Sequence, residues 1–214
     1  MKIGIIGYGG MASALAGQWV GSHEVMLSGR TREKVEAAAR EVGATPGTPR
    51  DAAAFGDVVV LATPGSAVFD AIEEAGGAAA FAGKTVVDIN NPIDVTTFTT
   101  TRTDGRSLTE AIADALPGAH VGKAFNMAQV AVWKDPDKTY DGRQMVTLYT
   151  ADDAADAHLA ELIRDVGADP VRLGDNSRAY QLEAAAAMVI RFLFAGGAPH
   201  TILNLIRPEA KPIR

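Results

Sequence analysis

The sequence of 214 residues contains no cysteine, only four histidines and few aromatic residues, which make up 6% of it. The absence of cysteine excludes disulfide bonds, thiolate metal sites and cysteine nucleophiles. It is compatible with a protein of the reducing cytosol. No Ser/His/Asp set, Glu–His pair or cluster of metal ligands can be recognised among the other residues. We therefore predict no catalytic acid, base or nucleophile and no metal site.

The chain also lacks a strong positive charge and a long apolar run. Its formal net charge is −6, which argues against nucleic acid or an anionic membrane surface as the main partner. The most apolar late stretch, residues 184–198, is interrupted by Arg191 and by glycines and is too short to span a bilayer. Met1 leads directly into a strand-like segment rather than into a secretory signal. We expect a soluble cytoplasmic protein that binds neither nucleic acid nor membranes.

Apolar runs alternate with segments of helical spacing along most of the chain. Strands are predicted at residues 3–6, 25–27, 57–62, 84–89, 120–126, 145–150 and 170–173, and helices at 11–20, 32–42, 51–55, 67–76, 107–116 and 152–166. This order predicts an α/β fold with a Rossmann-like doubly wound, mainly parallel sheet. Residues 45–50, 94–106 and 133–142 are predicted as loops, the second of them near the active site.

The first strand ends in the pattern Gly7-x-Gly9-x-x-Ala12, and a helix is predicted directly after it. Gly7 permits a tight turn, Gly9 lets the backbone approach a pyrophosphate, and Ala12 lets the helix pack closely on the strand. The pyrophosphate would bind the free N–H groups at the helix N-terminus. A purely structural glycine turn is the alternative, but the strand–turn–helix context favours dinucleotide binding. The predicted contacts in this turn are Gly7, Tyr8, Gly9, Gly10, Met11 and Ala12.

The end of the second strand indicates which dinucleotide is bound. A site that prefers NAD carries Asp or Glu about 20 residues after the glycines, where it binds the ribose 2′-hydroxyl. The corresponding stretch here is Ser28-Gly29-Arg30-Thr31-Arg32, without an acidic residue. Its two guanidinium groups can form forked hydrogen bonds with a 2′-phosphate, although a solvated basic start of the next helix is the alternative. We therefore predict NADP(H) as the cofactor, bound here by Ser28, Gly29, Arg30, Thr31, Arg32 and Lys34.

The pattern changes after residue 175. Residues 177–195 form one long predicted helix of small and apolar residues, which ends at Gly196 and Gly197, and residues 200–206 form a further short helical piece. These last segments are too short for an independent domain. We therefore predict an NADP-binding domain at residues 1–175 and a C-terminal helical cap and tail at residues 176–214.

Ligands of open α/β sheets bind outside the carboxyl ends of the strands. The predicted cofactor contacts at the later strand ends are Ala62, Thr63, Pro64, Asn91, Pro92, Ala124 and Asn126. Asn126 is the best candidate to orient the nicotinamide or the second substrate, although it could equally serve to turn the chain. Lys123 is a second orienting candidate, but a lysine inside a strand is more often an edge residue that extends its ammonium to solvent.

The lack of an acid–base centre limits the reaction. Reduction of a carbonyl group usually needs a proton donor beside the hydride acceptor. Hydride exchange between two cofactors needs little acid–base assistance, because the acceptor ring delocalises the charge and the protein mainly supplies orientation. The sequence therefore favours the second kind of reaction.

The chain resembles the F420:NADP oxidoreductases, NADPH-dependent reductases of the deazaflavin coenzyme F420. The resemblance rests on Lys-Ile-Gly-Ile-Ile-Gly-Tyr-Gly-Gly-Met from Lys2, on Ser-Gly-Arg-Thr-Arg-Glu-Lys from Ser28, and on the later Ala-Thr-Pro, Val-Asp-Ile-Asn-Asn-Pro-Ile, Lys-Ala-Phe-Asn and Leu-Glu-Ala-Ala segments. It implies reversible hydride transfer between NADP(H) and F420 as co-substrate. It also implies that Arg30, Lys34 and Ser28 hold the 2′-phosphate, that Thr63 and Pro64 line the cofactor, and that the cap helices form a homodimer and help enclose the deazaflavin.

Two other functions remain open on the sequence. The first is an NADPH-dependent reductase of a flavin, a ferric chelate or a small carbonyl compound. The second is a non-catalytic NADP-binding or sensor protein whose cap binds a partner.

Overall fold

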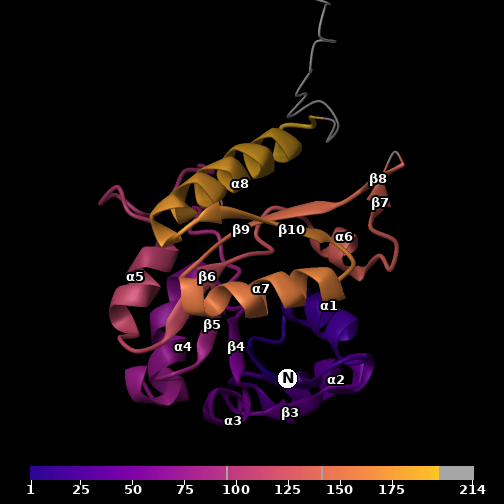
Figure 1. Ribbon diagram of the computed structural model, residues 1–214, viewed down its shortest axis with the longest axis vertical. Coiled ribbons are helices and arrows are strands. Elements are labelled where there is room, and N and C mark those ends of the chain that lie inside the picture. Colours follow the sequence, from indigo (N-terminus) through magenta and orange to yellow (C-terminus); the bar gives the residue numbers. More distant parts are fainter. Residues whose placement is uncertain (95, 141, 198–214) are drawn as a thin grey trace, which may run out of the picture.

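The computed structural model describes residues 1–94, 96–140 and 142–197, which are built around one eight-stranded sheet (Figure 1). The strands lie in the order β10-β9-β6-β5-β4-β1-β2-β3. Their bounds are β1 Lys2–Ile6, β2 Glu24–Ser28, β3 Thr45–Gly47, β4 Val58–Leu61, β5 Thr85–Asp88, β6 His120–Lys123, β9 Val146–Ala151 and β10 Asp169–Gly174. All neighbours pair in parallel except β6 and β9, which are antiparallel. The predicted doubly wound, mainly parallel sheet is confirmed.

Helices cover both faces of the sheet because alternate strand residues enter two apolar cores. One core joins Ile3, Ile5, Val58 and Val60 to α1, α2 and α7, and the other joins Ile6, Val59 and Leu61 to α3, α4 and α5. The helix bounds are α1 Gly10–Trp19, α2 Arg32–Val42, α3 Pro49–Phe55, α4 Val68–Ala75, α5 Leu108–Ala115, α6 Val130–Lys134, α7 Asp153–Asp165 and α8 Ala179–Phe194. Strands buried on both faces explain why the central runs are continuously apolar.

Two predicted loops contain regular structure. Residues 45–47 form β3, an edge strand that pairs with β2; an edge strand tolerates Pro46, which has no N–H to donate. Residues 133–142 overlap the short helix α6 and a small hairpin of β7 (Thr139–Tyr140) and β8 (Arg143–Gln144). Trp133 is fully buried on α6 and its indole N–H donates to the carbonyl of Ala128 at 3.1 Å. Elements this short do not show a recognisable period in the sequence.

Helix α8 lies over β9 and β10 at one end of the molecule (Figure 1). It buries Ala179, Leu182, Glu183 and Ala186 and exposes Tyr180, Met188 and Phe194. Within the described residues, no helix combines the length and apolarity that crossing a bilayer requires. The predicted helical piece at 200–206 lies outside the described residues, and the division of the chain at residue 175 stays a prediction.

Candidate functional site

The glycine turn after β1 combines a residue that must be glycine with one that leaves space. Gly7 has a φ of +145°, and a Cβ built on it would lie 2.3 Å from the carbonyl oxygen of Ala62. Gly9 is the N-cap of α1, and a Cβ there would meet no atom within 4 Å. No side chain caps α1, and its first turn contains no acidic residue. The helix therefore presents unoccupied N–H groups and a positive dipole end to an open space, an arrangement that suits an anion.

A cavity of about 450 Å³ opens in front of this turn. Of the predicted cofactor contacts, its lining contains Gly7, Tyr8, Gly9, Gly29, Arg30, Thr31, Ala62, Thr63 and Pro64. The hydroxyl of Thr63 is buried and has no hydrogen-bond partner among the described residues. A buried polar atom without a partner is costly, so a ligand that hydrogen-bonds Thr63 would stabilise this site. The cleft therefore fits the pyrophosphate and ribose part of a dinucleotide.

The cleft continues into a second cavity of about 350 Å³, whose lining includes Gly29, Arg30 and Arg32. The side chain of Arg30 is 72% exposed and lies 3.8 Å from Glu74, and that of Arg32 is 87% exposed and binds Glu36. Both guanidinium groups stand at the rim, where a 2′-phosphate could engage them without being buried. Lys34 is exposed but belongs to neither cavity lining.

The structure corrects the role predicted for Ser28. Its side chain is fully buried, and its hydroxyl donates to the carbonyl of Ile5 at 2.8 Å. The hydroxyl therefore supports the pairing of β1 with β2 and cannot reach a 2′-phosphate. Ala12, Pro92 and Ala124 are also buried and line neither part of the cleft.

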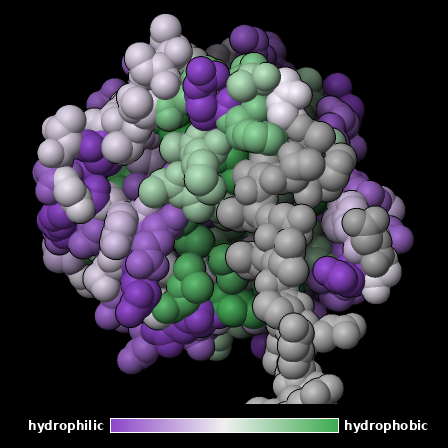
Figure 2. Space-filling model, turned by 90° about the horizontal axis from the view of Figure 1, so that it is seen from above, coloured by the Kyte–Doolittle hydropathy of each residue, from purple (hydrophilic) through white to green (hydrophobic). Residues whose placement is uncertain are grey.

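A separate cavity of about 410 Å³ lies beside the start of α1. It is lined by Met11, Ile89, Asn91, Phe125, Asn126, Met127, Ala128, Gln129 and Val130, and by Ala186, Val189, Ile190, Leu193 and Phe194 of α8. None of these side chains is ionisable. Seen from the α8 side, apolar side chains gather in the middle of this face, with hydrophilic ones around them (Figure 2). We call this space the acceptor cavity.

Two asparagines join the strand ends to α8 at the wall of the acceptor cavity. The Asn91 amide donates to the Asn126 carbonyl at 2.9 Å, and the Asn126 amide donates to Asn91 Oδ1 at 2.9 Å and to the Leu182 carbonyl at 3.0 Å. Asn126 Oδ1 is buried without a partner among the described residues. The side chain of Asn126 thus does hold the local chain in place, and its predicted role in orienting a substrate stays a prediction.

Phe125, which precedes Asn126, has a φ of +61°. Left-handed backbone is strained in a residue with a side chain, and it persists only where the surroundings fix it. The Phe125 ring packs edge-on against Trp19 and Trp133, with centroids 5.6 and 5.3 Å away. These contacts hold the turn that places Asn126 at the acceptor cavity.

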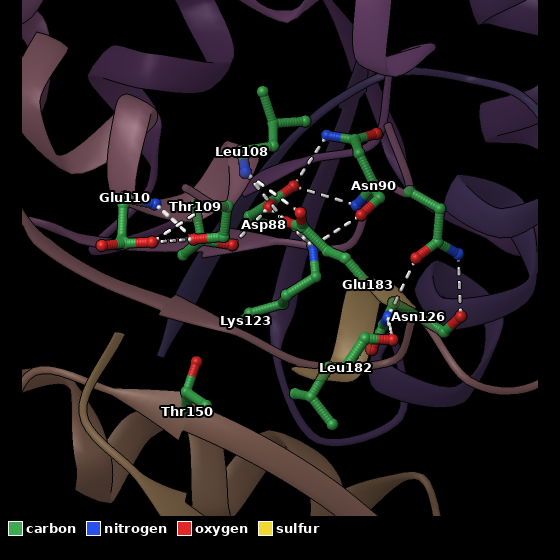
Figure 3. Close-up of polar contacts among 12 residues, drawn as sticks. Asp88, Asn90, Leu108, Thr109, Glu110, Lys123, Asn126, Thr150, Leu182 and Glu183 are labelled. Atoms are coloured by element: carbon green, nitrogen blue, oxygen red, sulfur yellow. Dashed lines mark hydrogen bonds and ion pairs between the residues drawn. The ribbon is translucent and has the colours of Figure 1, made fainter. Parts of the chain in front are cut away.

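An edge lysine would extend its ammonium to solvent, but Lys123 is fully buried. Figure 3 shows its side chain directed toward Asp88 and Glu183. Its ammonium lies 2.8 Å from Asp88 Oδ2 and 3.2 Å from Glu183 Oε1, and it donates to the Asn90 carbonyl at 2.6 Å. Three oxygen atoms thus accept hydrogen bonds or ion pairs from the ammonium. Lys123 does not line the acceptor cavity. Burial raises the pKa of Glu183, although Lys123 opposes this shift.

The structure brings together one histidine–carboxylate cluster that the sequence did not predict, because its members are distant in the sequence. Ligand atoms of His23, Glu161 and Asp165 lie within 4.8 Å of one another, and His23 Nε2 is 2.7 Å from Asp165 Oδ2. The His23 Nδ1 atom lies 3.2 Å from the Met1 amine. His23 precedes β2 and therefore lies at the sheet edge opposite the glycine turn, where it ties α7 to the start of the sheet.

Comparison with known proteins agrees with these features. A family described as "NADP oxidoreductase coenzyme F420-dependent" matches residues 2–92. A proposed F420-dependent NADP-reductase from Arthrobacter sp. FB24 is 30% identical over 93% of this chain and 96% of that one, with a TM-score of 0.83. A hypothetical protein from Sinorhizobium meliloti is 30% identical over 97% of this chain and 95% of that one, with a TM-score of 0.72. No curated protein sequence matches the chain.

More distant structures share the fold. A reductive aminase from Aspergillus terreus, in complex with NADPH and ethyl levulinate, is 23% identical over 91% of this chain and 62% of that one, with a TM-score of 0.69. The fold, the cleft and the matches define an NADP-dependent oxidoreductase. Within that class, the chain belongs to the coenzyme F420-dependent NADP oxidoreductase family.

Proposed function

We propose that the protein transfers hydride between NADP(H) and the deazaflavin coenzyme F420. The observation that carries the proposal is the acceptor cavity, whose described lining is apolar or uncharged throughout. Met11 of this lining follows the glycine turn directly. Asn91 also lines the cavity, and its carbonyl oxygen would lie 3.4 Å from a Cβ built on Gly65, the residue that follows Pro64 of the cleft. The cavity therefore adjoins the cofactor cleft, where a flat acceptor ring could lie against a nicotinamide.

The residues of the chain bind and orient two ligands rather than exchange protons with them. The N-terminus of α1 and Thr63 would hold the pyrophosphate and ribose, and Arg30 and Arg32 the 2′-phosphate. The apolar wall of α8 would exclude water from the acceptor cavity. When bound, NADPH would supply the hydride, and the one proton that the deazaflavin also takes up on reduction would come from solvent. Orientation of this kind can supply roughly 7–11 kcal/mol of a reaction barrier.

A carbonyl or imine acceptor fits the site less well. Such substrates usually need a proton donor within hydrogen-bond reach of the reduced group. The ionisable groups nearest in sequence to Asn126 and Leu182 are Lys123 and Glu183, and they are buried against each other rather than exposed in the cavity. We therefore favour F420 over a small carbonyl compound.

The test is to mix the protein with NADPH and oxidised F420 and to follow the visible absorbance of the deazaflavin. We expect bleaching that is stoichiometric with NADPH oxidation. Parallel reactions with a flavin, a ferric chelate and a small aldehyde serve as comparisons. Tight NADPH binding without bleaching of F420 would contradict the proposal, and turnover of one of the other acceptors would replace it.

Arg30→Ala is expected to weaken NADPH binding by about 1–3 kcal/mol while leaving NADH binding nearly unchanged, because a hydrogen bond to a charged group is lost. Arg30 lines both parts of the cleft, and its guanidinium has only a distant partner in Glu74, at 3.8 Å. Dissociation constants of both cofactors, measured by fluorescence, would check this. Arg40→Ala, an exposed change in the last turn of α2, the helix that follows Arg30 in the chain, is the control. Equal losses for both cofactors would mean that Arg30 does not bind the 2′-phosphate.

We also propose a cytoplasmic homodimer, in which the exposed residues Tyr180, Met188 and Phe194 of α8 contribute to the contact. The resemblance to F420 reductases implied such a dimer, and apolar side chains of this size on one helix support it.

A further inference from the structure

Helix α8 is fixed to the rest of the protein close to the acceptor cavity. Ala186 and Ile190 line the cavity and follow Glu183 by three and seven residues, so they share its side of the helix. Glu183 is the one acidic residue of α8 and is buried. The place of its carboxylate therefore sets the place of the cavity wall.

The Glu183 carboxylate binds two different elements. Its oxygens accept from the backbone N–H of Leu108 at 3.0 and 3.1 Å, at the start of α5. The Lys123 ammonium, at the end of β6, lies 3.2 Å from Oε1. The helix dipole of α5 and the ammonium both favour a negative charge at this point. Figure 3 shows the side chains of these elements converging on one buried cluster.

The opposite side of the cavity is bound to the same cluster. Lys123 donates to the carbonyl of Asn90, and the next residue, Asn91, lines the cavity and pairs with Asn126. Asp88 completes the cluster by accepting from Lys123, from the Thr109 hydroxyl at 2.7 Å and from the amide of Asn90 at 2.9 Å. One ammonium thus links the strand ends to α8.

We propose that Glu183 and Lys123 are positioning residues, which hold the α8 wall at a fixed distance from the strand ends so that the acceptor lies in transfer geometry. This inference rests on the proposed use of the acceptor cavity. Apolar packing alone would attach α8 at least as firmly, because a buried ion pair is often no more stable than apolar residues of similar volume. Directional hydrogen bonds add what packing does not, a defined position. A displacement of about 1 Å can lower a rate about a hundredfold.

Glu183→Gln is the test, because glutamine keeps the shape of the side chain but loses the charge. We expect the single-turnover rate of hydride transfer to fall about ten- to a hundredfold, while the Kd of NADPH changes less than twofold. A stopped-flow experiment with F420 and NADPH measures the rate. Glu110→Gln is the matched control, because Glu110 caps the same start of α5 through Ser107, and its side-chain hydrogen bonds and ion pair run to Ser107 and Arg106 rather than to α8. Its rate should equal that of the wild type.

Two further measurements keep the outcomes distinct. If Glu183→Gln does not fold, Glu183→Asp retains the charge on a shorter side chain and should show the same loss of rate with unchanged NADPH binding. An unchanged rate in a folded Glu183 variant would overturn the proposal. A loss of NADPH affinity as large as the loss of rate would overturn it too. Hydrogen exchange of α8, measured without F420, should be faster in Glu183→Gln and unchanged in α1. If the wild-type protein does not reduce F420, the proposed function fails, and this exchange then decides whether Glu183 positions α8.

Discussion

Lys123→Met should lower the free energy of unfolding by about 3–5 kcal/mol, the usual cost of removing one partner from a buried ion pair. Methionine fills a similar volume, so the loss is electrostatic rather than a cavity effect. The lysine side chain is fully buried, and its ammonium is within 3.2 Å of two carboxylates. Without it, Asp88 and Glu183 would share one interior region with no positive side chain between them. Urea unfolding at pH 8 would measure the difference from the wild type.

The loss should be smaller at low pH. Burial already raises the pKa of Glu183, and the ammonium is the main influence that lowers it. Removing the ammonium raises this pKa further in the folded state. A carboxyl group whose folded pKa exceeds its unfolded pKa costs stability as the pH rises from the unfolded value through the folded one. The variant should therefore lie closer to the wild type at pH 5 than at pH 8.

Lys84→Met provides the control for this change. The Lys84 ammonium is partly buried and donates to one backbone carbonyl, that of Gly56, at 2.6 Å, with no carboxylate in the described salt bridges. We expect a loss of only about 1 kcal/mol, the usual net value of one hydrogen bond. If Lys123→Met cost no more than Lys84→Met, or if its deficit did not depend on pH, the buried cluster would not be held by charge.

The parts of the site that depend on neighbouring residues could be predicted from the sequence. The turn from Gly7 to Ala12 requires a strand, two glycines and a helix in direct succession, and each is visible in one short stretch. The strand ends at Thr63 and Asn91 follow from the alternation of apolar and helical segments. The structure places Thr63 in the cofactor cleft and Asn91 in the acceptor cavity.

The buried cluster could not be predicted, because its members are far apart in the chain. Residues 88, 123 and 183 come from β5, β6 and α8, and only the packing of α8 on the sheet brings them together. A lysine in a strand and a glutamate in a helix are both more often exposed than buried. Ser28 is a related case, because it stands close to Arg30 in the sequence. Side chains alternate between the two faces of a strand, and that of Ser28 is buried and donates to the carbonyl of Ile5.

The two glycines of the turn should separate folding from cofactor binding. Gly9→Val is expected to leave the fold intact, because Gly9 has an ordinary φ of −75° and a Cβ there meets no atom within 4 Å. The valine would occupy the space in front of α1, where we place the pyrophosphate. We expect the Kd of NADPH to rise at least a hundredfold, equivalent to about 2.7 kcal/mol or more.

Gly7→Ala should instead lower the stability of the fold. Its Cβ would lie 2.3 Å from the Ala62 carbonyl oxygen and would be held at a φ of +145°. Overpacking against backbone and an unfavourable φ together cost at least about 3 kcal/mol, so thermal unfolding should occur at a clearly lower temperature. Unfolding curves and NADPH titrations of both variants would check the pair. A folded Gly9→Val protein that binds NADPH normally would place the pyrophosphate elsewhere, because Gly9 lines the cleft at the N-terminus of α1 and a side chain there enters the open space in front of the helix.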